Sequence, residues 1–411
     1  MASHPPVVQR FLRYVAIDTQ ASEESESYPS SAKQLDLSRL LVDELHALGV
    51  VDAELDEHGY VMGTVEANVE GPIPVIGFIA HVDTAPDVSG KDVKPQLHVN
   101  YAGGPIALDA ERSLTTTQSP ELEQNKGNTI ITTDGSTLLG ADDKAGIAEI
   151  MTFVQRLRDD PSIKHGKLRI AFTVDEEVGQ GTKHFDVKKF GAKFAYTVDG
   201  ESPGEIENET FCAESATAVF QGVNVHPGYA KDKMFNALKG AAAFVAALPQ
   251  KEAPETTEGR QGYIHPVALT GGVEETTLKM ILRDFEEAPL AVFRAKLEAI
   301  ATEVRESWPG LKVELSFEQS YRNMRFVLDD YPTVVENALE AVRRAGITPK
   351  LNQIRGGTDG AMLSFKGLPT PNIFAGGHLF HSRYEWIAIE AMEQAVETLV
   401  QLAQVWAEPA E

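Results

Sequence analysis

The sequence predicts an α/β protein with a three-layer α/β/α domain and a smaller, ferredoxin-like βαββαβ domain inserted into it. Short apolar, β-branched runs at residues 74–80, 168–174 and 194–198 are typical of buried strands in a parallel sheet covered on both faces. Helical patterns alternate with these runs, and after Ala213 the order changes to one that matches the split-βαβ unit. A chain of 411 residues also exceeds what one hydrophobic core usually organises.

The first segment of the larger domain carries most of the strand patterns. A polar stretch at residues 19–31 predicts a loop, after which Ser30 or Ser31 is the expected N-cap of a helix that Gly49 ends. Residues 87–134 are rich in Gly, Pro, Asn and Thr with weak periodicity, so we expect an irregular excursion there. The expected helices lie at residues 7–16, 32–48, 145–158 and 182–189, and the expected strands at 51–56, 60–66, 73–80, 168–174 and 194–198.

The inserted domain is expected at residues 213–322, so the larger domain is built from residues 1–212 and 323–411. Its expected order is a strand at 215–225, a helix at 230–248, strands at 263–270 and 276–284, a helix at 287–306 and a strand at 311–318. The larger domain then resumes with a helix at 332–345, a glycine-rich loop at 355–360, a strand at 371–374 and a helix at 386–407.

Composition excludes several classes of function. The net charge of −24 argues against binding to nucleic acid or to anionic membrane surfaces, because both need clustered Lys and Arg. Cys212 is the only cysteine, which excludes an intrachain disulfide and a cysteine-ligated zinc site. The N-terminal stretch lacks the apolar core of a secretory signal, and no run is long enough to span a membrane. We therefore expect a cytoplasmic protein.

Acidic and imidazole side chains follow several of the predicted strands or lie near the C-terminus. In open α/β sheets ligands bind at the carboxyl ends of the strands, so residues far apart in sequence converge there. Imidazole nitrogen and carboxylate oxygen are zinc ligands, and a carboxylate can bridge two metal ions. We expect Asp142 to be that bridge. The remaining candidate ligands are His81 and Asp199 for one ion, and Glu177 and His381 for the other.

Two further residues beside these ligands fit supporting roles. Neighbouring side chains on an extended segment point to opposite sides, so one of Glu176 and Glu177 can bind metal while the other acts as a general base. Asp83, two residues beyond His81, lies on the same side of an extended chain and could hold the imidazole. Taken singly, each motif also fits a helix N-cap, a turn or a strand end. Only their combination predicts water activated by two metal ions for amide hydrolysis.

The motifs around these residues resemble those of the cocatalytic zinc peptidases and aminoacylases, and within that family those of the tripeptide aminopeptidases. The stretches that carry the resemblance are HVDTAPDVSGKDVKPQ (81–96), TLLGADDKAGIAEI (137–150), FTVDEEVGQG (172–181), IRGGTDGA (354–361) and PNIFAGGHLFHSRYEW (371–386). The resemblance implies a homodimeric cytoplasmic enzyme with two zinc ions per chain, which removes the N-terminal residue of tripeptides. It implies the ligand sets above, Glu176 as base, Asp83 as the residue that orients His81, and His381 rather than His378 as ligand.

A tripeptide substrate needs a partner for its terminal carboxylate, and a guanidinium is the natural one. Arg283, at the end of a predicted strand of the inserted domain, and Arg355, in the glycine-rich loop, are the candidates. His226 could stabilise the oxyanion. Weaker candidates for substrate contact are Tyr263, His265 and Asn323.

Two alternative functions fit the same residues. The same architecture could act on an N-acyl amino acid or on a C-terminal peptide bond, which a comparison of free and N-acetylated tripeptides would reveal. A catalytically silent metal-dependent binding protein is the other alternative, although Glu176 argues against it because a binding protein has no use for a proton carrier.

Overall fold

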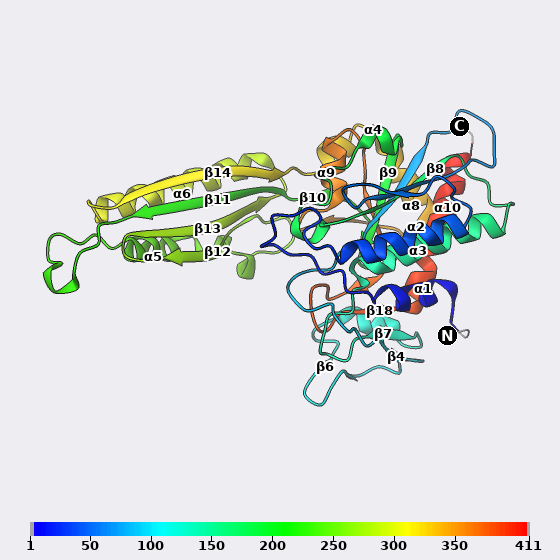
Figure 1. Ribbon diagram of the computed structural model, residues 1–411, viewed down its shortest axis with the longest axis horizontal. Helices are drawn as coiled ribbons and strands as arrows, with labels where there is room; N and C mark the ends of the chain where they lie inside the picture. The colour runs from blue at the N-terminus through cyan, green and yellow to red at the C-terminus, as the bar shows by residue number, and fades with distance from the viewer. Residues whose placement is uncertain (1–3, 409–411) are drawn as a thin grey trace. The chain divides into compact units, whose positions relative to one another are not determined.

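The computed structural model describes residues 4–408, and its contacts divide the chain into two compact units (Figure 1). Unit 1 runs through Asn208 and also contains Val327–Asn352 and the chain from Thr358 on. Unit 2 consists of Glu209–Phe326 and Gln353–Gly357. These junctions differ by a few residues from the expected 212/213 and 322/323. Arg355, expected in the larger domain, belongs to unit 2 because its short segment packs there.

Unit 1 is built around an eight-stranded mixed sheet whose central strands are parallel. β3 pairs in parallel with β8 and β9, and β9 pairs in parallel with β16, whereas the pairs toward both edges, β1 with β2, β2 with β8 and β10 with β16, are antiparallel. In sheet order the strands are β1 (Glu54–Leu55), β2 (Val61–Val65), β8 (Leu168–Thr173), β3 (Ile76–His81), β9 (Phe194–Gly200), β16 (Asn372–Phe374), β10 (Glu205–Thr210) and β15 (Lys350–Ile354).

Helices cover both faces of this sheet, as expected from its apolar strands. On β3, the Phe78 ring packs edge-on against Phe153 of α3 at 5.1 Å between centroids. The next residue toward the N-terminus, Gly77, faces Phe190 of α4 so closely that a Cβ would lie 2.5 Å from that ring. Neighbouring residues of one strand thus contact different helices, which confirms the three-layer α/β/α class. The helices of unit 1 are α1 (Pro6–Tyr14), α2 (Gln34–Ala47), α3 (Ala141–Asp159), α4 (Val187–Phe190), α7 (Arg325–Leu328, at the junction of the two units), α8 (Pro332–Arg344), α9 (Asp359–Phe365) and α10 (Ile389–Ala407).

The excursion at 87–134 has more structure than expected. It forms a hairpin and part of a four-stranded sheet, around a small core that includes Leu122 and Trp386. Its elements are β4 (Gln96–His98), β5 (Ile106–Ala107), β6 (Ser113–Leu114), the 3-10 helix η1 (Pro120–Asn125) and β7 (Ile130–Thr132), with β17 (Gly377–His378) and β18 (Trp386–Ala388) from the C-terminal part of the chain.

Three further expectations for unit 1 are corrected. The helix expected at 182–189 shrinks to the single turn of α4, since residues 182–184 form a turn and residues 185–186 are irregular. The strands β10 and β15 and the helix α9 were not expected from the sequence. The helix expected at 386–407 begins only at Ile389, because Trp386–Ala388 pair as a strand with β7.

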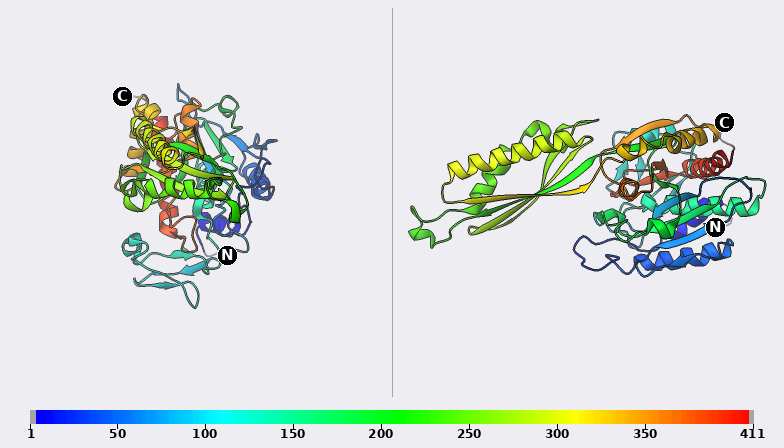
Figure 2. Two further views of the ribbon diagram at one scale, coloured as in Figure 1. Left: turned by 90° about the vertical axis from the view of Figure 1, so that its left-hand side faces the viewer. Right: turned by 90° about the horizontal axis from the view of Figure 1, so that it is seen from above.

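Unit 2 has the βαββαβ order that the sequence predicts. Its four-stranded antiparallel sheet has the order β12-β13-β11-β14, and the two helices α5 and α6 lie on one of its faces (Figure 2). Phe220, Phe244 and Leu297 belong to the core between sheet and helices. The elements are β11 (Cys212–Gln221), η3 (Pro227–Tyr229), α5 (Ala237–Ala247), η4 (Gln250–Glu252), η5 (Pro254–Thr256), β12 (Tyr263–Gly271), β13 (Glu275–Asp284), α6 (Glu287–Ser307) and β14 (Lys312–Tyr321). Within residues 4–408, no helix combines the length and the apolar character that crossing a bilayer requires.

Candidate metal centre

Two of the candidate ligands stand on neighbouring parallel strands. His81 is the last residue of β3, and Asp199 is the last but one of β9. Because β3 and β9 run parallel, both side chains reach the carboxyl edge of the sheet. His81 Nε2 lies 3.5 Å from Asp199 Oδ1. The apolar strand patterns therefore placed these two residues correctly.

Asp142 and Asp143 are adjacent, but only Asp143 caps the helix that follows them. Neither residue has helical backbone angles, and the regular part of α3 starts after them. Asp143 Oδ1 accepts the Gly146 backbone N–H at 3.2 Å, as an N-cap does, and Asp143 Oδ2 accepts the His81 backbone N–H at 3.1 Å. A Cβ on Gly146 would lie 1.9 Å from the Val198 carbonyl oxygen, so only glycine lets α3 approach β9 here. The N-cap alternative thus holds for Asp143 and leaves the Asp142 carboxylate available.

The Asp142 carboxylate connects two groups of possible ligands. Its Oδ1 lies 2.9 Å from His81 Nε2, and its Oδ2 lies 3.3 Å from His381 Nε2. His381 Nε2 also lies 2.7 Å from Glu177 Oε2. Within each group the ligand atoms lie within 4.8 Å of one another, and the two groups are His81, Asp142, Asp199 and Asp142, Glu177, His381. The five side chains expected to bind metal are therefore brought together, and Asp142 is the one that both groups share.

The turn with Glu176 and Glu177 is held by Asp83. These two glutamates lie in the single-turn 3-10 helix η2 (Glu176–Val178), not on an extended segment, so the expectation that they alternate sides of a strand is wrong. Asp83 Oδ1 accepts the Glu176 backbone N–H and Asp83 Oδ2 accepts that of Glu177, both at 3.1 Å. The Asp83 carbonyl oxygen lies 3.1 Å from His81 Nδ1, and the Asp83 carboxylate 3.4 Å. Asp83 therefore contacts both the imidazole and the turn.

Burial sets the electrostatics of this centre. It raises the pKa of Glu177 to about 8 and that of Asp199 to about 6, and raises the pKa of Glu176 well above its ordinary value. For Asp142, burial acts upward, but hydrogen bonds from His381 and His81 hold its pKa well below the ordinary value. Bringing several carboxyl groups together in a buried place is unfavourable unless opposite charge compensates them.

The donor set fits a pair of divalent metal ions. Two imidazoles and three carboxylates, one of them shared, form the ligand set that a two-metal hydrolytic site uses. Glu177 Oε1 is buried and has no hydrogen-bond partner in the described part of the chain, so it remains free to accept a cation. The competing candidate His378 belongs to neither group. It is buried and stacks on the Trp386 ring at 4.4 Å between centroids.

Sequence reasoning missed three buried carboxylates beside the centre. Glu385 accepts backbone N–H groups of the Asp142 loop, Asp175 is clamped by the segment before α2, and Asp359 accepts the Thr173 hydroxyl at 2.7 Å. Asp359 lies against Gly181, where a Cβ would be 2.1 Å from Asp359 Oδ1. All three occur inside the motifs of the resemblance, but no local pattern distinguishes a carboxylate that binds backbone from one that binds metal.

The expected substrate residues all lie in unit 2. Arg283 Nη1 donates to the Glu214 and Leu282 carbonyl oxygens, and its guanidinium lies over the Tyr321 ring. Arg355 donates to residues 257–261 through both terminal nitrogens. His226 is exposed, and its Nδ1 accepts the Gly228 N–H at 3.1 Å.

The weaker candidate Asn323 has no capacity left for a substrate. It is buried, its amide nitrogen donates to Glu209 and Phe285, and its amide oxygen accepts from Thr210 and Arg325. These contacts make Asn323 a residue that holds unit 2 together rather than one that meets a ligand.

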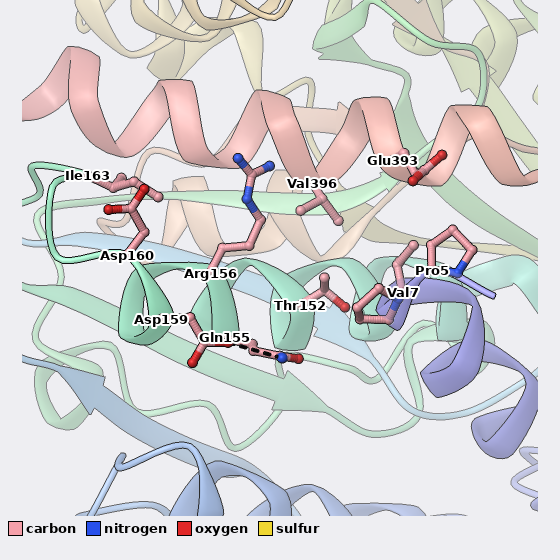
Figure 3. Close-up of a pocket in the computed structure, with 11 residues that line it drawn as sticks. Pro5, Val7, Thr152, Gln155, Arg156, Asp159, Asp160, Ile163, Glu393 and Val396 are labelled. Atoms are coloured by element: carbon pink, nitrogen blue, oxygen red, sulfur yellow. Dashed lines mark hydrogen bonds between the residues drawn. The ribbon is translucent and has the colours of Figure 1, made fainter. Parts of the chain in front are cut away.

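Unit 1 also contains a cavity of about 360 Å³ that none of the candidate ligands lines (Figure 3). Residues from α1, α3 and α10 surround it, among them Val7, Arg156 and Val396. Its walls combine aliphatic side chains with Asp159, Asp160 and Glu393 and do not include any His. This cavity therefore does not have the ligand set of a metal site.

Comparisons with known proteins agree with this geometry. Residues 120–405 match the model of peptidase family M20/M25/M40. The chain is 49% identical over 404 residues to a Peptidase T of Shouchella clausii, covering 98% of this chain and 99% of that protein. It is 51% identical over 399 residues to a Peptidase T of Vibrio cholerae, covering 97% of each. The crystal structure of a Bacillus cereus aminopeptidase shares the fold, with a TM-score of 0.75, 24% identity and 98% of each chain covered. The resemblance to this peptidase family is confirmed, and the chain belongs to peptidase family M20/M25/M40, a family of hydrolases.

Proposed function

We propose that this protein is a dinuclear zinc aminopeptidase that hydrolyses the N-terminal peptide bond of tripeptides. The observation that carries the proposal is the division of the Asp142 oxygens between two groups, each of which adds one histidine and one carboxylate. Full-length identity of about half to proteins named Peptidase T supports the aminopeptidase activity.

In this proposal His81, Asp142 and Asp199 hold one zinc ion, and Asp142, Glu177 and His381 hold the other. When bound, the two ions polarise the scissile carbonyl and lower the pKa of water. Asp83 contacts the His81 ring and accepts hydrogen bonds from the backbone of Glu176 and Glu177, so it fixes the position of the ring relative to the turn.

Glu176 is the proposed general base. Its backbone is fixed by Asp83, its side chain is half-buried, and its carboxylate makes no hydrogen bond to the described residues. Burial raises the pKa of Glu176, which suits a carboxyl group that must hold a proton between two steps. It takes a proton from the attacking water and gives it to the leaving amine as the C–N bond breaks, so no covalent enzyme intermediate forms.

We further propose that unit 2 binds the substrate ends and acts as a lid that measures substrate length. In Arg283, Nε and Nη2 make no hydrogen bond to the described residues, so two donors remain for a terminal carboxylate. Arg355 has committed both terminal nitrogens to the loop at 257–261, so its contribution is smaller. Because His226 Nδ1 accepts a hydrogen bond, the neutral ring carries its proton on Nε2, which becomes a donor for the oxyanion. Homodimeric assembly and a cytoplasmic location belong to the same proposal.

The test combines metal analysis with a peptide panel. We expect two zinc ions per chain and release of the first residue from a tripeptide, with much slower turnover of the matching dipeptide and tetrapeptide. The N-acetylated tripeptide should resist hydrolysis because an aminopeptidase needs the charged amine. Faster hydrolysis of the acetylated peptide, or release of the C-terminal residue, would overturn the proposal in favour of an N-acyl amino acid hydrolase or a carboxypeptidase. Two bound zinc ions without hydrolysis of any peptide would indicate a binding protein.

A further inference from the structure

The segment from Thr19 to Gln34, the first residue of α2, contributes no candidate ligand or base, yet it binds two of the loops that carry them. We call this segment the brace. It belongs to unit 1, as do both loops, and its sequence pattern predicts a polar loop over most of its length, ahead of a capped helix. The structure gives its polar side chains specific partners.

The first half of the brace binds the loop that follows His81 and Asp83. Backbone hydrogen bonds join Ala21 to Thr84 at 3.0 Å and Thr84 to Thr19 at 3.4 Å. Gln20 Nε2 is within hydrogen-bond distance of three carbonyl oxygens of this loop, those of Ala85, Pro86 and Val88, at 3.0 to 3.2 Å. This half therefore supports the loop of the first ligand.

The second half of the brace forms hydrogen bonds with Asp175, the residue directly before Glu176. We call these hydrogen bonds the clamp. The Asp175 carboxylate accepts the Ser30 backbone N–H at 2.6 Å, the Ser30 hydroxyl at 2.5 Å and Gln34 Nε2 at 2.6 Å. In return the Asp175 backbone N–H donates to Gln34 Oε1 at 3.1 Å. The expectation that a serine caps α2 is wrong. The cap position is Lys33, without a side-chain hydrogen bond, and the Ser30 hydroxyl is used on Asp175 instead.

Asp175 needs this clamp for two physical reasons. It is 1% exposed, and a buried carboxylate without hydrogen bonds is strongly unfavourable. Its φ of 58° puts a non-glycine residue in the left-handed region, at a cost of about 1–3 kcal/mol that the surroundings must offset. In the described structure every side-chain hydrogen bond of Asp175 comes from Ser30 or Gln34. The brace therefore sets the backbone conformation from which Glu176 and Glu177 project.

We propose that Ser30 and Gln34 are positioning residues for Glu176 and Glu177, acting through Asp175. The inference rests on the proposed function, in which these two glutamates are the base and a metal ligand. Without the clamp Asp175 leaves its strained conformation, and the two glutamates move relative to His381 and Asp142. Displacements of about 1 Å are enough to cost about a hundredfold in rate.

Matched variants separate positioning from mere stability. Ser30→Ala and Gln34→Ala each remove side-chain hydrogen bonds to Asp175 and leave the Ser30 backbone N–H in place, and Ser30→Thr restores the hydroxyl. Ser31→Ala is the control for serine removal, since the buried Ser31 hydroxyl has no hydrogen-bond partner in the described chain. Leu37→Ala is the control for stability, because Leu37 is fully buried on α2 and makes no polar contact with the turn.

Three measurements are made on each full-length variant: the Tm, kcat and KM for a tripeptide, and titration of the metal-free protein with Co²⁺ followed by its visible absorption spectrum. For Ser30→Ala and Gln34→Ala we expect kcat to fall about tenfold to a hundredfold with little change in KM. The spectrum of the Co²⁺-loaded protein should change, because Glu177 is displaced. Ser30→Thr and Ser31→Ala should behave like the parent, and Leu37→Ala should lower the Tm alone.

The proposal is overturned if Gln34→Ala and Leu37→Ala lower the Tm alike while kcat and the Co²⁺ spectrum of both match the parent. The Co²⁺ arm does not depend on activity. If the parent binds Co²⁺ but hydrolyses no peptide, the proposed function fails, and altered spectra in Ser30→Ala and Gln34→Ala would still support the positioning role.

Discussion

Glu385 Oε1 accepts the backbone N–H of Asp142 at 3.0 Å, so a buried carboxylate four residues beyond His381 holds the residue that both candidate metal groups share. Its other oxygen, Oε2, accepts the backbone N–H groups of Leu139 and Gly140 at 2.7 and 2.8 Å. One carboxylate thus ties the Asp142 loop to the chain segment of His381.

Replacing this carboxylate should weaken metal binding without removing a ligand. In Glu385→Gln an amide N–H₂ group faces backbone donors, so we expect a loss of about 1.5–3 kcal/mol in stability and weaker binding of zinc. Glu390→Gln is the matched control, because Glu390 also accepts a backbone N–H, that of Thr129, but contacts no candidate ligand. Thermal unfolding and zinc titration check the pair, and equal zinc affinity in both variants would contradict the positioning of Asp142 by Glu385.

Substitution of the adjacent residues Glu176 and Glu177 should distinguish catalysis from metal binding. Glu176→Gln should keep both metal ions and lose about a thousandfold in kcat, since an amide cannot carry the proton. Glu177→Gln should lose metal as well as activity, because Glu177 lies in one of the two ligand groups. Metal content per chain and tripeptide hydrolysis check both variants. If Glu176→Gln also lost metal, it would be a ligand and the base would lie elsewhere.

Metal removal should destabilise the protein in a pH-dependent way. A ligand at a hundred times its Kd stabilises the folded state by about 2.7 kcal/mol, so a chelator should lower the Tm.

Burial raises the pKa of Glu177 to about 8, so at pH 7 this carboxyl holds a proton that an incoming cation must displace. Metal affinity should therefore fall as pH falls. Calorimetric titration in two buffers of different ionisation enthalpy measures the released protons, and identical heats in both buffers would refute this.

Glu149 on α3 should be an internal source of instability. It is 0% exposed, neither carboxyl oxygen has a hydrogen-bond partner in the described chain, and burial raises its pKa well above the ordinary value. The folded protein keeps this proton while the unfolded chain releases it, so stability is lost as pH rises from about 4.5 toward the folded pKa. Glu149→Met should gain about 1–3 kcal/mol at pH 7 and remove this slope. Denaturant unfolding at several pH values checks it, with Glu336→Met, at an exposed position of α8, expected to change little.

His378 should make the fold sensitive to acid. Burial lowers its pKa to about 4, so the folded protein keeps the ring neutral while the unfolded chain takes up a proton below about pH 6.5. Stability is therefore lost as pH falls from about 6.5 toward 4. Going from pH 7 to 5, the parent should lose about 2 kcal/mol more than His378→Phe, which keeps the stacking on Trp386. Parallel losses in both proteins would show that His378 does not titrate in this way.

Local sequence patterns were sufficient for the parts that obey a simple periodic rule. The apolar strand runs predicted β3, β8 and β9, and their parallel pairing brings His81 and Asp199 to one edge of the sheet. The βαββαβ order of unit 2 likewise follows from alternating strand and helix patterns. Two short motifs then identified Glu177 and His381, which lie in one group with Asp142.

The chain by itself therefore determined the α/β class, the two-unit order and the residues that meet at the candidate metal centre. Only the tertiary structure decided how those residues are held. Ser30 donates a hydrogen bond to Asp175, and Glu385 accepts one from the backbone of Asp142. Glu176 and Glu177 lie in a 3-10 turn rather than on a strand. The physical reason is that a buried strand appears as a run of apolar residues, which a short stretch of sequence is enough to reveal. A hydrogen bond between residues 145 positions apart leaves no periodic signal, because it depends on where folding brings two otherwise ordinary polar side chains.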